Sequence, residues 1–195
     1  MHRTAAAVGS TIFFALAPGT LAGLIPWWLT GWHLRHTETA AWIPLRVLGG
    51  ALIAAGLIVL VAAFVRFVTE GIGTPAPVAP PEHLVVGGFY RYVRNPIYLA
   101  LTALIVGQGL LLGQLGLIRY AAIVAAGLVA WVYGLEEPEL RDRFGAEYTE
   151  YHRAVPGWSR KLLRAILDSV GNLGIWLTAV TLGAVLRGHV SRETP

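Results

Sequence analysis

Two adjacent acids, Glu136 and Glu137, follow directly after an apolar run and are the residues best placed to do chemistry. A charge lying deep in lipid costs at least ~2.5 kcal/mol, so something must compensate these carboxylates. They either reach water at the end of a membrane helix or bind a cationic or hydroxyl-bearing ligand. Their position alone favours the helix-end interpretation, because charges at helix ends are common at membrane surfaces.

A second polar segment, residues 73–96, carries groups that would complement such acids. Four prolines within seven residues favour an extended path there, and the glycine pair Gly87 and Gly88 allows close backbone approach. Tyrosine faces nearby can hold a positively charged sulfonium. Asn95 suits a helix N-cap and Pro96 the first helical position. Taken singly, the arginines and tyrosines could be membrane anchors, but their grouping favours a ligand site.

The composition indicates that these segments belong to a membrane protein. Hydrophobic residues make up 55% of the 195 residues and charged residues 13%, whereas ordinary soluble domains carry about 25% charged residues. Mean hydropathy is +0.61. Four or five apolar runs approach the roughly 20 residues that span a bilayer: 4–32, 47–65, 95–118, 120–135 and 169–186. We therefore predict a single domain over residues 1–195, an all-α polytopic membrane bundle of about five transmembrane helices.

Local signals add a hairpin and an interfacial helix to this bundle. The short link Gly113 to Gly116 predicts a helical hairpin between the third and fourth runs. The fourth run is short, because sixteen residues rise about 24 Å against a hydrocarbon core of ~30 Å. Beyond it, apolar and aromatic residues recur at helical spacing: Leu140, Phe144, Tyr148 and Tyr151. This spacing predicts an amphipathic helix at the membrane interface.

The basic residues predict the orientation. If five runs span, residues 66–94 and 136–164 share a side with the amino terminus, and that side carries ten Lys and Arg against five on the other. The positive-inside rule then places this side of the protein in the cytoplasm. We expect the chain to lie in a bacterial inner membrane, with the cofactor site facing the cytoplasm. The first run could instead be a signal peptide cleaved after Ala17. However, apolar sequence continues beyond Pro18, as a spanning helix requires.

Together, the two polar segments resemble a known family. LVVGGFYRYVRNPIYLA at 84–100, followed after the hairpin by EEPELRDRFGAEYTEYHRAVPGW at 136–158, resembles the isoprenylcysteine carboxyl methyltransferase family, which is related to the phospholipid N-methyltransferases. The resemblance covers 47–158, and two motifs in the right order are more specific than either alone. It implies that S-adenosylmethionine binds between loops 73–96 and 136–158. The transmembrane helix predicted at 165–186 is additional to the family pattern.

The resemblance also implies roles for individual residues. Those expected to bind the cofactor are His83, Leu84, Val85, Tyr90, Asn95, Pro96, Ile97, Tyr98, Glu136 and Glu137. Asn95 and Glu136 are the candidate catalytic residues. Many family members have histidine at the position of Asn95, so direct proton transfer by an imidazole is not available in this chain.

The expected acceptor is a lipophilic small molecule or a lipid that enters from the bilayer. Prenylcysteine methyltransferases carry an arginine four residues before the first acid, where this chain has Val132. A prenylcysteine carboxylate is therefore not the expected substrate. Two other functions stay open: an NADPH-dependent membrane oxidoreductase similar to the sterol reductases, and a non-catalytic membrane protein.

Other classes of site lack support in the sequence. Cysteine is absent, which excludes a thiolate nucleophile. His33 and His36 are three residues apart but have no evident third ligand, so we predict no metal site. The basic residues flank apolar runs, as membrane anchors do, and we predict no nucleic-acid partner. The sequence does not specify the oligomeric state.

Overall fold

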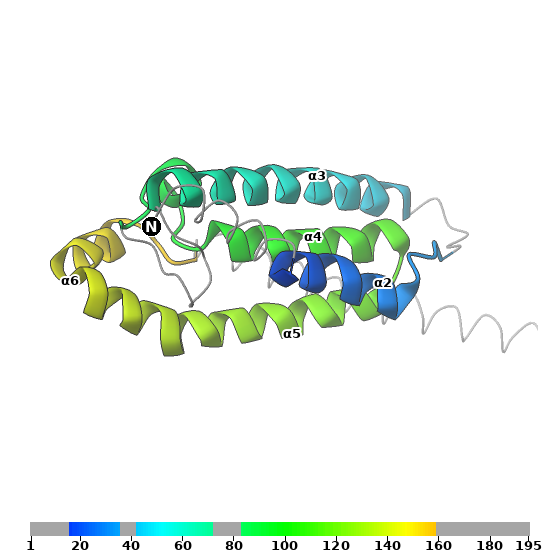
Figure 1. Ribbon diagram of the computed structural model, residues 1–195. Helices are drawn as coiled ribbons and strands as arrows, with labels where there is room; N and C mark the ends of the chain where they lie inside the picture. Colours follow the sequence, from blue (N-terminus) through cyan, green and yellow to red (C-terminus); the bar gives the residue numbers. More distant parts are fainter. Residues whose placement is uncertain (1–15, 36–41, 72–82, 159–195) are drawn as a thin grey trace, which may run out of the picture. The chain divides into compact units, whose positions relative to one another are not determined.

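A computed structural model describes residues 16–35, 42–71 and 83–158 (Figure 1). These residues form helices and turns, and no strand occurs among them. The elements are η1 (Thr20–Leu24), α2 (Ile25–Thr30), α3 (Trp42–Arg66), η2 (Phe67–Gly71), η3 (Gly88–Arg91), α4 (Pro96–Leu112), α5 (Leu115–Trp131), η4 (Val132–Glu136) and α6 (Glu137–Ala154). The chain divides into two compact units, Met1–Gly157 and Trp158–Pro195, and all these elements lie in the first.

α3 is a 25-residue apolar helix that carries little charge. It starts earlier than the predicted run at residue 47, because Trp42 and Ile43 are apolar and Pro44 is tolerated in a first helical turn. The helix continues beyond Arg66 into the π-helical turn η2. Its exposed side chains include many large apolar ones: Ile43, Val47, Leu48, Leu57, Ile58, Val61 and Val65. A surface of this kind suits contact with lipid.

Glycines allow α3 and α4 to pack closely. A Cβ atom at Gly49 would lie 2.7 Å from the backbone oxygen of Gly107, and one at Gly107 would lie 2.8 Å from the backbone oxygen of Gly49. Two turns further along α3, a Cβ at Gly56 would lie 3.0 Å from Leu104 Cγ. Small residues let helix backbones approach in a membrane, where van der Waals packing drives association. The α3–α4 pair therefore forms a closely packed core.

α4 and α5 form the predicted hairpin (Figure 1). Gly113 ends α4 at φ 69°, a left-handed conformation that glycine adopts readily. α5 begins at Leu115, earlier than the predicted start at residue 120, so the exposed Arg119 lies within the helix. The 17 residues of α5 then lead directly into the five of η4. The fourth helical run is therefore longer than the sequence predicted.

Two side chains of the α4–α5 hairpin donate hydrogen bonds to backbone carbonyls that precede Pro26 in the first helical segment. Pro26 has no backbone N–H, so the carbonyl of Ala22, four residues before it, lacks its usual helical donor. Gln108 Nε2 donates a hydrogen bond to that oxygen at 2.8 Å. Tyr120 Oη donates to the neighbouring carbonyl of Leu21 at 3.0 Å. Unsatisfied carbonyls are costly in lipid, so these two bonds fix the segment to α4 and α5.

The helix lengths are consistent with a membrane bundle. Within the described residues, two helices are long and apolar enough to cross a membrane, α3 and the run beginning at Leu115. α4 is apolar but shorter, at 17 residues. The first predicted span is described only from residue 16 onward, and residues 165–186 lie outside the described part. The total of about five transmembrane helices therefore stays a prediction.

α6 is the predicted amphipathic helix, but it is bent at Gly145. The backbone there has φ 52° and ψ −116°, a conformation that is costly for any residue with a Cβ. Tyr148, beyond the bend, is fully buried, whereas Leu140 and Phe144 before it are half-buried. The bend returns the second half of the helix to the loop before α4, where Tyr151 Oη donates to the carbonyl of Tyr90 at 2.8 Å.

Candidate active site between the starts of α4 and α6

The loop before α4 is anchored by side chains that lie in the apolar core. Val85 and Tyr90 of the loop, together with Ile97 in the first turn of α4, belong to one buried apolar cluster with Leu60 and Phe64 of α3. Burial raises the pKa of the Tyr90 phenol above its ordinary value, and the negative charge of Glu136 adds to the shift. Tyr90 therefore stays protonated at neutral pH. The side chains of Val85 and Ile97 are buried in this cluster. Only the backbone groups of these two residues are therefore left to contact a ligand.

Glu136 meets the first turn of α4. Tyr98 Oη donates a hydrogen bond to Glu136 Oε2 at 2.7 Å. Glu136 is the last residue of the π-helical turn η4, and such turns occur frequently at functional sites. Its side chain is half-buried, and among the described residues its second carboxylate oxygen has no hydrogen-bond donor. Glu136 is thus held in place by one oxygen and has the other available.

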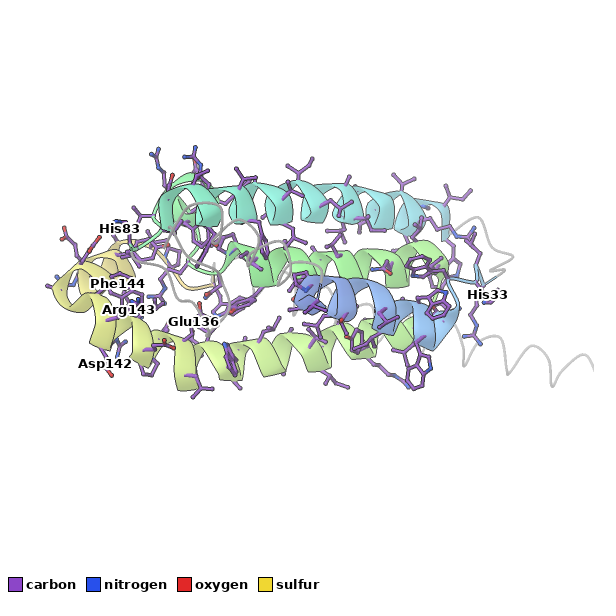
Figure 2. The ribbon with its side chains drawn as sticks, in the orientation of Figure 1. His33, His83, Glu136, Asp142, Arg143 and Phe144 are labelled. Atoms are coloured by element: carbon purple, nitrogen blue, oxygen red, sulfur yellow. The ribbon has the colours of Figure 1, made fainter. Side chains whose placement is uncertain are left out.

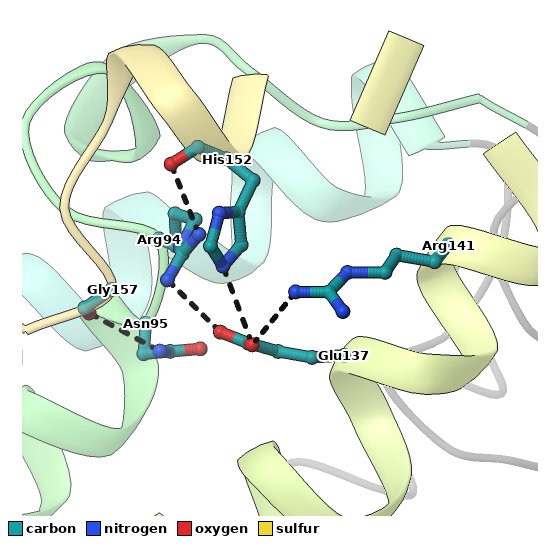
Figure 3. Close-up of polar contacts among 6 residues, drawn as sticks. All are labelled: Arg94, Asn95, Glu137, Arg141, His152 and Gly157. Carbon is teal, nitrogen blue, oxygen red and sulfur yellow. Dashed lines mark hydrogen bonds and ion pairs between the residues drawn. The ribbon is translucent and has the colours of Figure 1, made fainter. Parts of the chain in front are cut away.

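Glu137 has a different environment from its neighbour (Figure 3). Its Oε1 lies 2.9 Å from Arg94 Nη2, and the two side chains are only 8% and 9% exposed, respectively. Its Oε2 lies 3.4 Å from His152 Nε2 and 3.9 Å from Arg141 Nη2. Both oxygens therefore face cationic or polar partners from the protein. Removing one member of such a buried ion pair typically costs about 3–5 kcal/mol.

Arg94 and Asn95 also bind the far end of α6 (Figure 3). Arg94 Nη1 donates to the carbonyl of His152 at 3.2 Å, and the Arg94 backbone N–H donates to Pro156 O at 3.0 Å. A cation at this position complements the carbonyls of a helix C-terminus. Asn95 Nδ2 donates to Gly157 O at 3.1 Å. A Cβ at Gly157 would lie 2.5 Å from Arg94 Nη2, so a larger residue there would have to displace the Arg94 guanidinium.

The carboxylate of Glu70 holds the loop before α4 at its glycine pair, Gly87 and Gly88. Glu70 Oε2 accepts a hydrogen bond from the Gly87 backbone N–H at 3.1 Å, and Glu70 Oε1 lies 2.6 Å from Arg66 Nη1. The Glu70 carboxylate occupies the space that a Cβ on Gly87 would need. Gly88 has φ 58°, which favours glycine for its backbone as well. The glycine pair thus permits close approach, as the sequence predicted, and the group that approaches is Glu70.

The predicted site residues are partly brought together. A hydrogen bond joins Tyr98 to Glu136. Glu137 pairs with Arg94, and Asn95, the next residue in the chain, binds Gly157 O. Asn95 occupies the N-cap of α4, but its side chain makes no capping hydrogen bond, contrary to the sequence expectation. Pro96 is buried at the helix start, as predicted.

His83 and Leu84 begin the described part of the loop. His83 is exposed and lies at the same end of the helices as Glu136, far from His33 (Figure 2). Leu84 is half-buried. Residues 73–82 of the predicted cofactor loop lie outside the described residues. Within the described residues, no group of acids and histidines could hold a metal ion.

Comparison with known protein families decides the affiliation of the chain. The model of the phospholipid methyltransferase family matches residues 45–147, which is more than half of the sequence. The chain belongs to the phospholipid methyltransferase family. The match includes the start of α4 and the paired acids, so the resemblance identified in the sequence is confirmed at family level. No curated protein and no solved structure matches the chain.

For this member of the phospholipid methyltransferase family, sequence reasoning overlooked the residues that hold the site together. Arg94 and Arg91 look alike in the sequence, yet Arg94 is buried in the ion cluster and Arg91 is exposed. Glu70 and His152 were also not singled out. The available signal was the position of Arg94, immediately before the Asn-Pro start of α4.

Proposed function

We propose that this protein is a methyltransferase that uses S-adenosylmethionine to methylate a lipophilic acceptor within the membrane. The observation that carries the proposal is the hydrogen bond between Tyr98 and Glu136. It joins, across 38 residues of sequence, the two segments whose motifs resemble cofactor-binding methyltransferase motifs. Family membership supports the methyltransferase class, and the apolar helices support an acceptor from the bilayer.

The side chains near Glu136 fit the chemistry of the proposed cofactor. S-adenosylmethionine carries an ammonium group, ribose hydroxyls and a cationic sulfonium, and it would supply the methyl group to a nucleophile on the acceptor by in-line displacement. The available oxygen of Glu136 can accept a hydrogen bond from the ammonium or a hydroxyl. Tyr90 and Tyr98 offer aromatic faces to a cation. Because Glu137 is neutralised by Arg94, it does not add a second free negative charge.

The roles of the protein groups follow from methyl transfer itself. The reaction needs no covalent enzyme intermediate, so the enzyme accelerates it chiefly by holding the reactants in line. Glu136 and Tyr98 are proposed to hold the cofactor. Asn95 stays a candidate catalytic residue, and the hydrogen bond from its Nδ2 to Gly157 O also links the start of α4 to the segment after α6. The apolar side chain of Val132, which is buried one helical turn before Glu136, would help to exclude water from this carboxylate.

Binding measurements on the purified protein in detergent or lipid nanodiscs test the proposal. S-adenosylmethionine, its demethylated product and NADPH would be titrated separately by calorimetry. We expect saturable binding of the first two and none of NADPH. Binding of NADPH alone would instead support a membrane oxidoreductase. A folded protein that binds none of the three would support a non-catalytic role, and either outcome would refute the proposal.

A further inference from the structure

We propose that Arg94 and Glu137 are positioning residues, which form a clasp that directs the neighbouring Glu136 toward Tyr98. The clasp is defined as the ion pair between Arg94 Nη2 and Glu137 Oε1 at 2.9 Å. This inference rests on the proposed function for its effect on the cofactor, but its geometric content can be tested in the cofactor-free protein. It assigns the two adjacent acids different roles, although the sequence predicted both as cofactor ligands.

Glu137 is more deeply buried than Glu136. The side chains of the clasp are 9% and 8% exposed, so a ligand could reach Glu137 only by displacing Arg94 or His152. Displacing Arg94 would leave a buried guanidinium without its counter-charge, at a cost of several kcal/mol. The second carboxylate oxygen of Glu136 has no such competitor, because the hydrogen bond from Tyr98 occupies only the first. Glu136 is therefore the acid suited to a ligand and Glu137 the acid suited to holding the structure.

Arg94 connects the start of α4 to three places on or after α6. Its guanidinium binds Glu137 at the first turn of α6 and the carbonyl of His152 at the last turn. Its backbone N–H binds the carbonyl of Pro156 beyond the helix. One side chain thus fixes the start of α4 relative to both ends of the bent α6. These are the elements whose relative position sets the distance from Tyr98 to Glu136.

The residues of the clasp lie close in sequence to the two residues proposed to hold the cofactor. Glu136 precedes Glu137 directly, and Tyr98 lies one helical turn after Arg94 and Asn95. Adjacent residues of a helix point about 100° apart, so fixing the direction of Glu137 also fixes that of Glu136. Loss of the clasp should release the 2.7 Å contact between Tyr98 and Glu136 without removing either group.

A spectroscopic measurement on the cofactor-free protein tests the geometry. The seven tyrosines would be replaced by 3-fluorotyrosine, and the Tyr98 signal would be assigned by its loss in Tyr98→Phe. In Glu136→Gln the hydrogen bond from Tyr98 is weakened, so this variant shows where the Tyr98 resonance lies when that bond is weak. We expect the double variant Arg94→Met with Glu137→Leu to move the Tyr98 signal toward that position. The double variant removes both buried charges together, a change that proteins often tolerate.

Two single variants serve as matched comparisons. Arg141→Met removes the exposed arginine at 3.9 Å from Glu137, and we expect a much smaller shift, because exposed ion pairs contribute little. Glu147→Gln removes an exposed acid further along α6 and should leave the Tyr98 signal in place. A Tyr98 signal that stays fixed in the folded double variant would overturn the inference, whether or not the protein binds S-adenosylmethionine.

A binding measurement completes the test. In the double variant we expect the dissociation constant for S-adenosylmethionine to rise about tenfold, which corresponds to the loss of one charge-assisted hydrogen bond. If Glu137 were instead a direct ligand, Glu137→Gln would weaken binding while the Tyr98 resonance stayed unchanged, and the positioning role would be refuted. Absence of binding by the wild-type protein would refute the proposed function alone, since the spectroscopic result stands independently of it.

Discussion

At the scale of single residues, the paired acids show how identical neighbours acquire different tasks. Glu137 is neutralised by Arg94 within a buried cluster, whereas Glu136 is half-buried and bound through one oxygen to Tyr98. The sequence could predict that something compensates these charges, because lipid penalises them. It could not predict the partner, since Arg94 and Glu137 are 43 residues apart and the sequence holds several other arginines.

We expect Glu136→Ala to weaken binding of S-adenosylmethionine while the protein still folds. A lost charge-assisted hydrogen bond is worth roughly 1.5–3 kcal/mol, or about ten- to a hundredfold in affinity. Titration calorimetry against the wild type measures the change. Glu147→Ala, which removes an exposed acid on α6, is the control and should bind normally. Unchanged binding in a folded Glu136→Ala protein would contradict the cofactor role and would support the alternative that Glu136 is only a charge at a helix end.

At the scale of elements, the sequence located most helices but not their contacts. The α3 span, the hairpin and the Asn-Pro start of α4 were predictable, since each depends on a local signal: an apolar run, a glycine link or a proline. The bend at Gly145 was missed because the stripe from Leu140 to Tyr151 keeps helical spacing on both sides of it. Long-range side-chain contacts such as Gln108 to Ala22 leave no periodic trace in a sequence.

We expect Gly49→Leu to destabilise the α3–α4 pair, whereas Gly50→Leu should be tolerated. A Cβ at Gly49 would lie 2.7 Å from two backbone atoms of α4, which cannot move aside as a flexible side chain could, but a Cβ at Gly50 meets nothing within 4 Å. Overpacking costs typically ~1–3 kcal/mol. The melting temperature in detergent measures the difference. Equal melting of the two variants would show that the close crossing is not required.

We expect Gln108→Leu to loosen the first helical segment. The variant leaves the carbonyl of Ala22 without its donor opposite Pro26, and an unsatisfied buried group costs about 1–3 kcal/mol. Hydrogen exchange over residues 20–30 should rise relative to the wild type. The matched control is the double variant Gln108→Leu with Pro26→Ala, which restores a backbone N–H to the helix. Recovery of protection in the double variant would confirm the cause, and exchange unchanged in Gln108→Leu would contradict it.

At the scale of the whole molecule, the basic residues predict which way the protein faces. The candidate site lies at the end of the helices that carries Arg91, Arg94 and the arginines of α6. By the positive-inside rule we expect this end in the cytoplasm, where S-adenosylmethionine would be available. Reporter fusions within residues 75–81 test the orientation, with fusions at the Gly113 turn as the opposite-side control. Reporter activity outside the cell from residues 75–81 would contradict it.

We expect the acceptor to be a lipophilic molecule or lipid rather than a prenylated cysteine carboxylate. Val132 is buried and apolar, and the guanidinium of Arg94, at the start of α4, is already paired with Glu137. A carboxylate brought to this site would lack a partner, which is strongly disfavoured. Labelled S-adenosylmethionine would be offered with a farnesylcysteine analogue and, separately, with a membrane lipid extract. Efficient labelling of the analogue would contradict the prediction.

The connection from Arg94 to the far end of α6 has a consequence for the order of synthesis. Arg94 and Asn95 leave the ribosome long before their partners, since His152 follows Arg94 by 58 residues and Gly157 follows Asn95 by 62. Until then, the start of α4 has a guanidinium and an amide whose acceptors do not yet exist. The site can therefore close only after the segment that follows α6 has been synthesised, and a nascent chain that stops short of Pro156 would carry the Asn-Pro start of α4 and the paired acids in an open arrangement.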